Sequence, residues 1–178
     1  MVVRPGEVFS VWQVAGEPTA QRGYQPAAAL KAGELTQETG GAICLLSTVL
    51  YNVGLLAGLQ VLEQHCHSVD SYGERRYFEL GRDAAIEFGY LDLRFRNSWM
   101  QALRLSVSVT DDAVQASFSA AVARPFDVGL IVSLPEDAGH DERGREMFSV
   151  RTTRRIDQAD APVLSEDLGI SNYRRAPG

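Results

Sequence analysis

Residues 40–62 decide the fold, and they read GGAICLLSTVLYNVGLLAGLQVL. None of them is charged, and the apolar side chains recur at the spacing of one helix face. We therefore expect a strongly buried helix over residues 44–62, at the centre of a globular domain. Scattered polar side chains and the glycines Gly54 and Gly58 argue against a membrane span of this length. The glycines would also let another element pack closely. The expected buried face consists of Leu46, Val49, Leu50, Val53, Leu56 and Ala57.

Downstream of this stretch the hydrophobic period changes to two. Apolar and polar residues alternate over residues 91–96, 103–109 and 114–120, and Asp111-Asp112 reads as a turn. This pattern predicts an antiparallel meander with one buried face, followed by a less regular strand within 126–134. The expected fold class is therefore α+β, with a central buried helix starting at Cys44 and packed on a mostly antiparallel sheet.

Length and charge limit the remaining possibilities. A chain of 178 residues can bury a real core, and a single main domain over residues 1–135 is the default. Residues 136–178 predict a polar linker and then a C-terminal hairpin or tail, packed on that domain or flexible beside it. The net charge of −6, without a large basic cluster, argues against nucleic acid as a partner. The sequence does not fix the oligomeric state.

Cys44 is the residue that points to chemistry. It follows two glycines and begins the predicted helix, where partial positive charge and free N–H groups favour a thiolate. The run His65-Cys66-His67 comes about twenty residues later, and a histidine brought alongside could take the thiol proton. The same residues could ligate zinc, but the paired Cys-x-x-Cys spacing of structural zinc sites is absent. We therefore expect no metal and no other cofactor.

Four further residues are candidates for a site with Cys44 and a histidine. Asp83 could accept the Nδ1–H of the histidine and so fix its tautomer, or it could simply pair with Arg82. The planar guanidinium of Arg82 could instead bind a substrate carboxylate. Backbone N–H groups at the Gly41–Leu45 turn could hold an oxyanion. Ser47 is a substrate-binding candidate whose alternative role is to satisfy local backbone groups.

Motifs along the chain from Pro5 to about Pro135 resemble the VanW family, first named from vancomycin-resistance gene clusters. The resemblance favours His67 over His65 as the base, although a purely structural role for His67 stays open. Two positions depart from the family pattern: Ala42 replaces a third glycine, and Leu45 replaces a glutamine that could donate to an oxyanion. The matching segments are Pro5–Ser10, Gly16–Ala20, Arg22–Tyr24, Gly40–Asn52, Leu56–Leu59, Glu63, His65, His67-Ser68, Gly81–Ala84 and Tyr90–Asn97.

The resemblance implies a cell-envelope protein with L,D-transpeptidase activity. Cys44 would attack a peptidoglycan stem peptide, and His67 and Asp83 would support proton transfer. The alternative is a non-catalytic module that binds a peptide or the cell wall and retains the fold, which Ala42 and Leu45 favour. In both cases the expected partner is a stem peptide or a similar peptide.

The N-terminus leaves the location open. Met1-Val2-Val3-Arg4 is followed at once by Pro5-Gly6, without the apolar segment of a signal peptide. A true start at Met1 therefore predicts a cytoplasmic protein. Proteins that resemble this family often carry an upstream membrane anchor, and a missing anchor would instead place the protein in the cell envelope.

Overall fold

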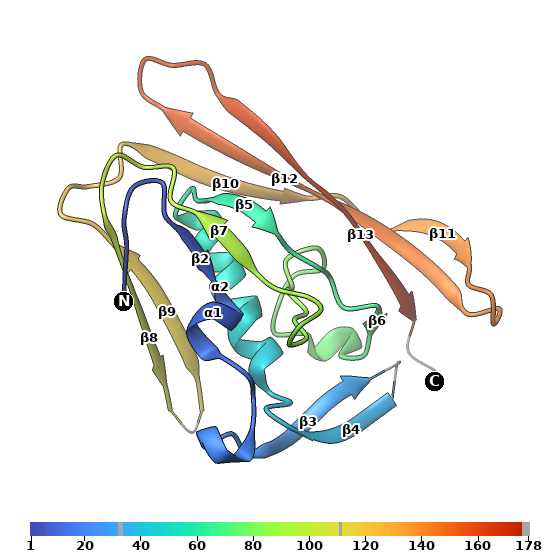
Figure 1. Ribbon diagram of the computed structural model, residues 1–178. Coiled ribbons are helices and arrows are strands. Elements are labelled where there is room, and N and C mark those ends of the chain that lie inside the picture. Colours follow the sequence, from blue (N-terminus) through green and yellow to red (C-terminus); the bar gives the residue numbers. More distant parts are fainter. Residues whose placement is uncertain (32–33, 111, 176–178) are drawn as a thin grey trace.

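The computed structural model describes residues 1–31, 34–110 and 112–175 and has an α+β fold, as predicted (Figure 1). Two α-helices, α1 (Val11–Ala15) and α2 (Ile43–Leu56), are described, and α2 lies at the centre with sheets around it. Short 3-10 turns cover Ala20–Arg22 and Gly73–Arg75. The strands are β1 (Val2–Val3), β2 (Val8–Ser10), β3 (Pro26–Lys31), β4 (Glu34–Thr39), β5 (Gln60–Glu63), β6 (Val69–Asp70), β7 (Arg94–Arg96), β8 (Leu103–Val109), β9 (Val114–Ser119), β10 (Phe126–Val132), β11 (Glu136–His140), β12 (Glu146–Gln158) and β13 (Leu164–Arg175).

Helix α2 is shorter than the sequence predicted, because it ends at Leu56 and not at Leu62. Gly58 adopts a left-handed conformation with φ of 72°, which glycine reaches without steric cost. The N–H groups of Gly58 and Leu59 donate to the carbonyls of Leu55 and Gly54, an arrangement that closes the last turn. The chain then reverses into β5, which returns along the helix toward its start.

The strands form several small sheets. The strand orders are β1-β8-β9, β2-β7-β5 and β10-β12-β13-β6, with β11 also paired to β12, and β3 pairs with β4. The prediction of one meander was therefore wrong in part: β8 and β9 pair, but β7 pairs with β2 and β5. Strand β2 precedes α2 in the sequence and β5 follows it. Because both pair with β7, the three strands form one sheet that packs on the helix. Asp111 of the predicted turn lies outside the described residues.

The core forms between α2 and the β2-β7-β5 sheet. Phe95 of β7 is fully buried and stacks between Phe9 and Tyr51, with ring centroids 6.4 and 6.3 Å apart. The buried face of α2 differs from the predicted one, since Leu56 is 41% exposed. The helix is turned so that polar side chains of its first turns face the core. The buried residues of α2 are Ser47, Thr48, Leu50, Tyr51, Gly54 and Leu55.

The C-terminal hairpin is built into the fold. Strands β12 and β13 pair antiparallel over a longer range than predicted, and part of the predicted linker forms β11. The buried guanidinium of Arg154 on β12 donates to the carbonyls of Leu55 and Leu59, at 3.3 and 2.8 Å, and its Nε donates to Glu166. This cation satisfies carbonyls at the C-terminal end of α2 and fixes the hairpin to the central helix.

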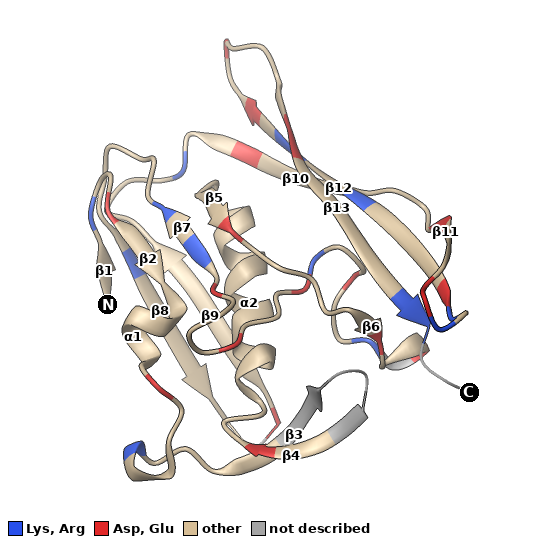
Figure 2. Cartoon of the chain, turned by 45° about the vertical axis from the view of Figure 1, so that its right-hand side comes forward, with Lys and Arg blue, Asp and Glu red and all other residues tan. Residues whose placement is uncertain are grey.

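Charged residues of both signs are interspersed over strands and loops (Figure 2). Within the described residues, neither helix is both long and apolar enough to cross a membrane. The expectation of a core helix rather than a membrane span therefore agrees with a 14-residue α2 surrounded by strands.

We predict that Gly54→Ala destabilises the fold. A Cβ at residue 54 would lie 2.5 Å from Cζ of Phe95, whose ring is held on both faces. Overpacking of this kind costs about 1–3 kcal/mol, which exceeds the gain in helix propensity of up to about 1 kcal/mol. Urea denaturation should show a lower free energy of unfolding. Gly129→Ala is the control, because a Cβ there meets nothing within 4 Å; an equal loss in both variants would contradict the packing argument.

Candidate active site

Hydrogen bonds with α2 hold the segment 82–84 beside the first turns of the helix. The hydroxyl of Ser47 donates to the carbonyl of Ala84 at 2.5 Å, and Thr48 Oγ1 accepts from the N–H of Ala84 at 3.1 Å. The amide of Asn52 donates to the carbonyl of Arg82 at 2.8 Å. Because these bonds fix the backbone on both sides of Asp83, they also fix where its side chain points.

The segment after β5 lies on the other side of Asp83. The N–H of Ala85 donates to the carbonyl of His65 at 2.8 Å, and the side chain of Gln64 donates to the carbonyl of Asp83 at 2.7 Å. These contacts place the two segments side by side. His67 therefore arrives near the start of α2, although it follows the end of that helix in the sequence.

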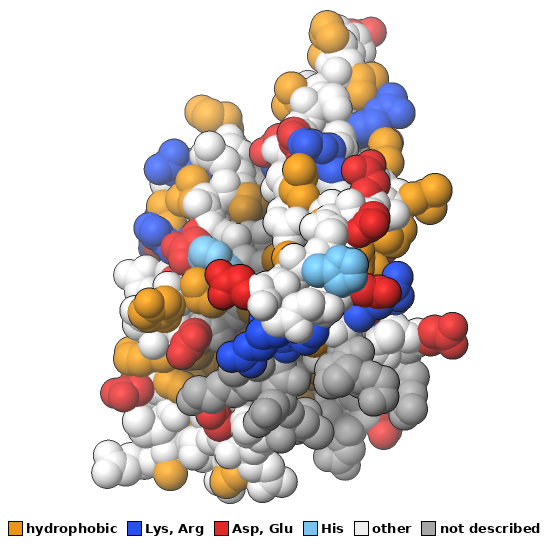
Figure 3. Space-filling model, turned by 90° about the vertical axis from the view of Figure 1, so that its right-hand side faces the viewer, with side chains coloured by type: hydrophobic (Ala, Val, Ile, Leu, Met, Phe, Trp, Pro, Cys, Tyr) orange, Lys and Arg blue, Asp and Glu red, His pale blue; other side chains and the backbone are white. Residues whose placement is uncertain are grey.

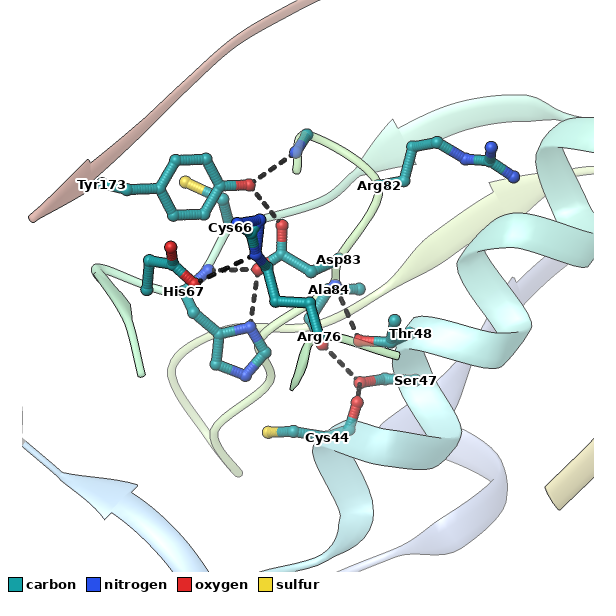
Figure 4. A network of polar contacts seen from close by, with 12 residues as sticks. Cys44, Ser47, Thr48, Cys66, His67, Arg76, Arg82, Asp83, Ala84 and Tyr173 are labelled. Atoms are coloured by element: carbon teal, nitrogen blue, oxygen red, sulfur yellow. Dashed lines mark hydrogen bonds and ion pairs between the residues drawn. The ribbon is translucent and has the colours of Figure 1, made fainter. Parts of the chain in front are cut away.

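Asp83 is fully buried and hydrogen-bonded on both oxygens (Figure 4). Its Oδ2 lies 2.6 Å from His67 Nδ1 and accepts from the His67 backbone N–H at 2.7 Å. Its Oδ1 accepts from the hydroxyl of Tyr173 at 2.6 Å. The short contact with Nδ1 places a proton on that nitrogen and leaves Nε2 as the ring nitrogen for other partners.

Cys44 lies in the first turn of α2 and is half-buried. Its side chain points toward the His67 ring (Figure 4), and its proximity contributes to the raised pKa of that imidazole. Sγ lies 3.6 Å from the carbonyl oxygen of Ile86, which accepts a hydrogen bond from the protonated thiol. The structure therefore places Cys44 beside the hydrogen-bonded pair of His67 and Asp83.

The surroundings of His67 favour its charged form. Burial lowers the pKa of the imidazole, but the hydrogen bond with Asp83 and then the nearby Cys44 raise it, and the net effect is a pKa of about 9. At neutral pH His67 therefore carries a positive charge between a buried carboxylate and a thiol. Such a charge stabilises an adjacent thiolate.

The other predicted residues lie differently. Arg82 points away from Cys44 (Figure 4) and donates to Asn52 at 2.8 Å and to Glu79 at 3.0 Å. Ser47 is fully buried, and its hydroxyl, which donates to the Ala84 carbonyl, also lies 3.1 Å from the carbonyl oxygen of Cys44, so it serves the backbone. His65 pairs with Glu63 at 3.2 Å. These contacts engage all three side chains away from the thiol.

The start of α2 offers few backbone donors. The N–H groups of Gly41, Ile43 and Leu45 already donate to the carbonyls of Glu38, Gly40 and Ala42. In the described part of the chain this leaves the N–H groups of Ala42 and Cys44 as candidate donors to an oxyanion. Of the N–H groups at the helix start that the sequence predicted as oxyanion donors, two therefore remain available.

Two features of the site were not predicted from the sequence. Tyr173 lies 90 residues after Asp83, so no local motif signalled their contact. Phe78 stacks on His67 with centroids 6.3 Å apart, and Tyr72 and Tyr77 pack edge-on against Phe78. Burial, followed by the proximity of Tyr72, raises the pKa of Tyr77. The aromatic residues Tyr72, Tyr77 and Phe78 are visible in the sequence, but they show no periodicity that would assign them to the site.

The remaining thiol and the wider surface suggest no second centre. Cys66 Sγ lies 3.6 Å from the carbonyl of Asn172, and burial raises the pKa of this thiol. Among the described residues, no group of three or more His, Cys, Asp or Glu could hold a metal ion. Figure 3 shows histidine and charged side chains of both signs on the face that it displays.

Comparison with known proteins assigns the chain to a family. Residues 1–119 match the family described as VanW like protein, and the chain belongs to this VanW-like family. It is 38% identical over 102 residues to the uncharacterized protein YoaR of Bacillus subtilis (strain 168). It is 29% identical over 115 residues to the vancomycin B-type resistance protein VanW of Enterococcus faecalis (strain ATCC 700802 / V583).

The matches cover only parts of these relatives. They include 57% of this chain and 32% of YoaR, and 64% of this chain and 42% of VanW. No solved structure matches the chain significantly. The comparisons therefore establish the family and not a reaction.

We predict that Asp83→Asn lowers the pKa of His67 from about 9 toward its ordinary value of about 6.5. The neutral amide cannot balance the imidazolium charge. In the wild-type protein the raised pKa stabilises the fold below about pH 6.5, and this contribution is lost as the pH rises through about 9. NMR titration of His67, together with unfolding measured across this range, checks both points. A raised His67 pKa that persists in the Asp83→Asn variant would contradict the pairing; His65 provides the internal reference.

Proposed function

We propose that this protein is a cysteine acyltransferase of the L,D-transpeptidase type that acts on peptidoglycan stem peptides. The observation that carries the proposal is the arrangement of Cys44, His67 and Asp83, in which a thiol at a helix start points toward an imidazole that is paired with a buried carboxylate. Membership of the VanW-like family supports a substrate in the cell envelope, because the named relative is a vancomycin B-type resistance protein.

The acylation step would use the thiolate of Cys44. Its Sγ attacks the carbonyl carbon that precedes a terminal D-amino acid, and a thioester forms as the C–N bond breaks. His67 donates its Nε2 proton to the departing amine. The other ring proton stays on Nδ1, where it remains hydrogen-bonded to Asp83. The N–H groups of Ala42 and Cys44 would donate to the oxyanion.

The transfer step returns the site to its starting state. The side-chain amine of a second stem peptide attacks the thioester carbon and gives a proton to His67 Nε2. Its nitrogen forms the new amide bond, and the Cys44 sulfur leaves as a thiolate. Water in place of the amine would give a trimmed peptide, so the same site would act as a carboxypeptidase. Neither step requires a cofactor.

A non-catalytic peptide- or cell-wall-binding module is the second candidate. Leu45 favours it, because its apolar side chain cannot supply the amide donor that the family pattern places after the cysteine. Ala42 favours it as well, since a Cβ stands where the pattern has glycine. The two candidates differ in a single measurable property, which is acylation of Cys44.

We predict that the wild-type protein forms a Cys44 thioester with disaccharide-tetrapeptide and yields 3→3 cross-linked or trimmed products. Cys44→Ala should lower turnover roughly 10⁴-fold or more, because the nucleophile is lost. The free energy of unfolding should change by less than about 3 kcal/mol, because the residue is only half-buried. Mass spectrometry of intact protein and of muropeptides measures adduct and products.

Cys66→Ala is the matched control and should retain the adduct, since Cys66 contacts the Asn172 carbonyl and lies outside the proposed reaction. Binding of muropeptides by the wild-type protein without any adduct would favour the binding module. Equal turnover in Cys44→Ala and wild type would remove Cys44 from the mechanism.

A further inference from the structure

We propose that Tyr173 is a positioning residue that fixes the Asp83 carboxylate against His67, so that the C-terminal hairpin completes the site. Tyr173 belongs to β13, whereas the family match ends at residue 119. The structure thus draws one member of the polar network from a part of the chain that the family match does not include. The catalytic meaning of this network rests on the function proposed above.

The hydroxyl of Tyr173 makes two hydrogen bonds of defined direction. It accepts from the backbone N–H of Gly81 at 2.7 Å and donates to Asp83 Oδ1 at 2.6 Å. Because the Gly81 N–H occupies an acceptor position, the hydroxyl proton is directed at the carboxylate. The ring is 1% exposed and stacks on Phe148, with centroids 5.4 Å apart, so its own position is fixed.

Asp83 depends on this donor because it has no contact with solvent. Both hydrogen bonds from His67 reach Oδ2, and Tyr173 supplies the bond to Oδ1. A buried carboxylate oxygen without a donor is costly, since protein groups must replace the lost water. Removal of the hydroxyl would therefore leave Oδ1 without a donor and free the carboxylate to rotate, which loosens its hold on His67.

The hairpin also contacts both ends of the segment from Ser68 to Gly81, which contains Phe78 beside His67. At one end, the N–H of Arg174 donates to the Ser68 carbonyl at 3.0 Å, next to the parallel pairing of β13 with β6. At the other end, the hydroxyl of Thr152 on β12 donates to the Gly81 carbonyl at 3.0 Å. Tyr173 acts between these two anchors, so its effect on Asp83 can be separated from simple docking of the hairpin.

Other titratable groups surround this network and have to be considered in a pH experiment. Cys44 on α2 lies near His67 and contributes to its pKa, and Asp83 pairs with Nδ1 of the same ring. Tyr77, from the loop after β6, interacts with both Cys44 and Asp83, and Cys66 interacts with Asp83. These residues are unchanged in Tyr173→Phe and Thr152→Val, so a difference between those two variants reports on Tyr173.

The test compares Tyr173→Phe with Thr152→Val. The first removes only the hydroxyl that contacts Asp83, and the second removes a buried hydrogen bond between the hairpin and Gly81. The His67 pKa, measured by NMR titration, should fall by about one unit or more in Tyr173→Phe, as expected for a lost charge-assisted hydrogen bond. The midpoint of the pH profile for iodoacetamide labelling of Cys44 should shift in that variant as well. Thr152→Val should leave both close to wild type.

An unchanged or raised His67 pKa in Tyr173→Phe would overturn the proposal, and so would an equal fall in Thr152→Val. If Tyr173→Phe does not fold, the wild-type protein provides a second measurement. The Tyr173 hydroxyl proton should exchange slowly and resonate downfield, and it should move upfield in Asp83→Asn; a rapidly exchanging hydroxyl proton would overturn the proposal. None of these measurements uses muropeptide turnover. They therefore test the role of Tyr173 independently of the transpeptidase proposal, whose failure would show only in the turnover experiment.

Discussion

The buried carboxylate of Asp83 is the constraint on which the rest of the structure depends. It lies out of contact with solvent, so the protein must supply every donor that water would otherwise provide. Those donors come from the segment after β5 and from β13, while α2 fixes the backbone on either side. A mobile hairpin or a displaced return strand would leave this charge unpaired, so the same interaction that organises the site also joins distant parts of the fold.

The length of α2 decides whether Cys44 and His67 can meet. A helix that continued to Leu62 would leave about five residues to cover a return of about 28 Å, which is too few. The helix ends at Leu56 because Gly58 takes a left-handed conformation, and β5 then runs back toward the helix start. Gly54 contributes in a different way, since the missing side chain admits the Phe95 ring between two other aromatic rings.

The C-terminal hairpin acts at both ends of the central helix. Near the C-terminal end, Arg154 satisfies the carbonyls of Leu55 and Leu59. Near the site, Tyr173 contacts Asp83. A buried cation and a buried hydroxyl are costly to leave unpaired, so the hairpin is held in register with α2. A segment that composition alone describes as a linker and tail is in this way part of the scaffold.

The sequence by itself determined the family, the α+β class, the helix start to within one residue (Ile43 in place of Cys44), the close packing at the two glycines and the choice of Cys44, His67 and Asp83 as candidates. These depend on local periodicity, glycine conformation and short motifs, which a single sequence carries. Only the tertiary structure decided that β7 leaves the predicted meander, that Arg82 points away from the thiol, that His65 pairs with Glu63, and that Tyr173 reaches Asp83. Those outcomes depend on burial and on hydrogen bonds between residues far apart in the chain, and such pairings leave no periodic trace in the sequence.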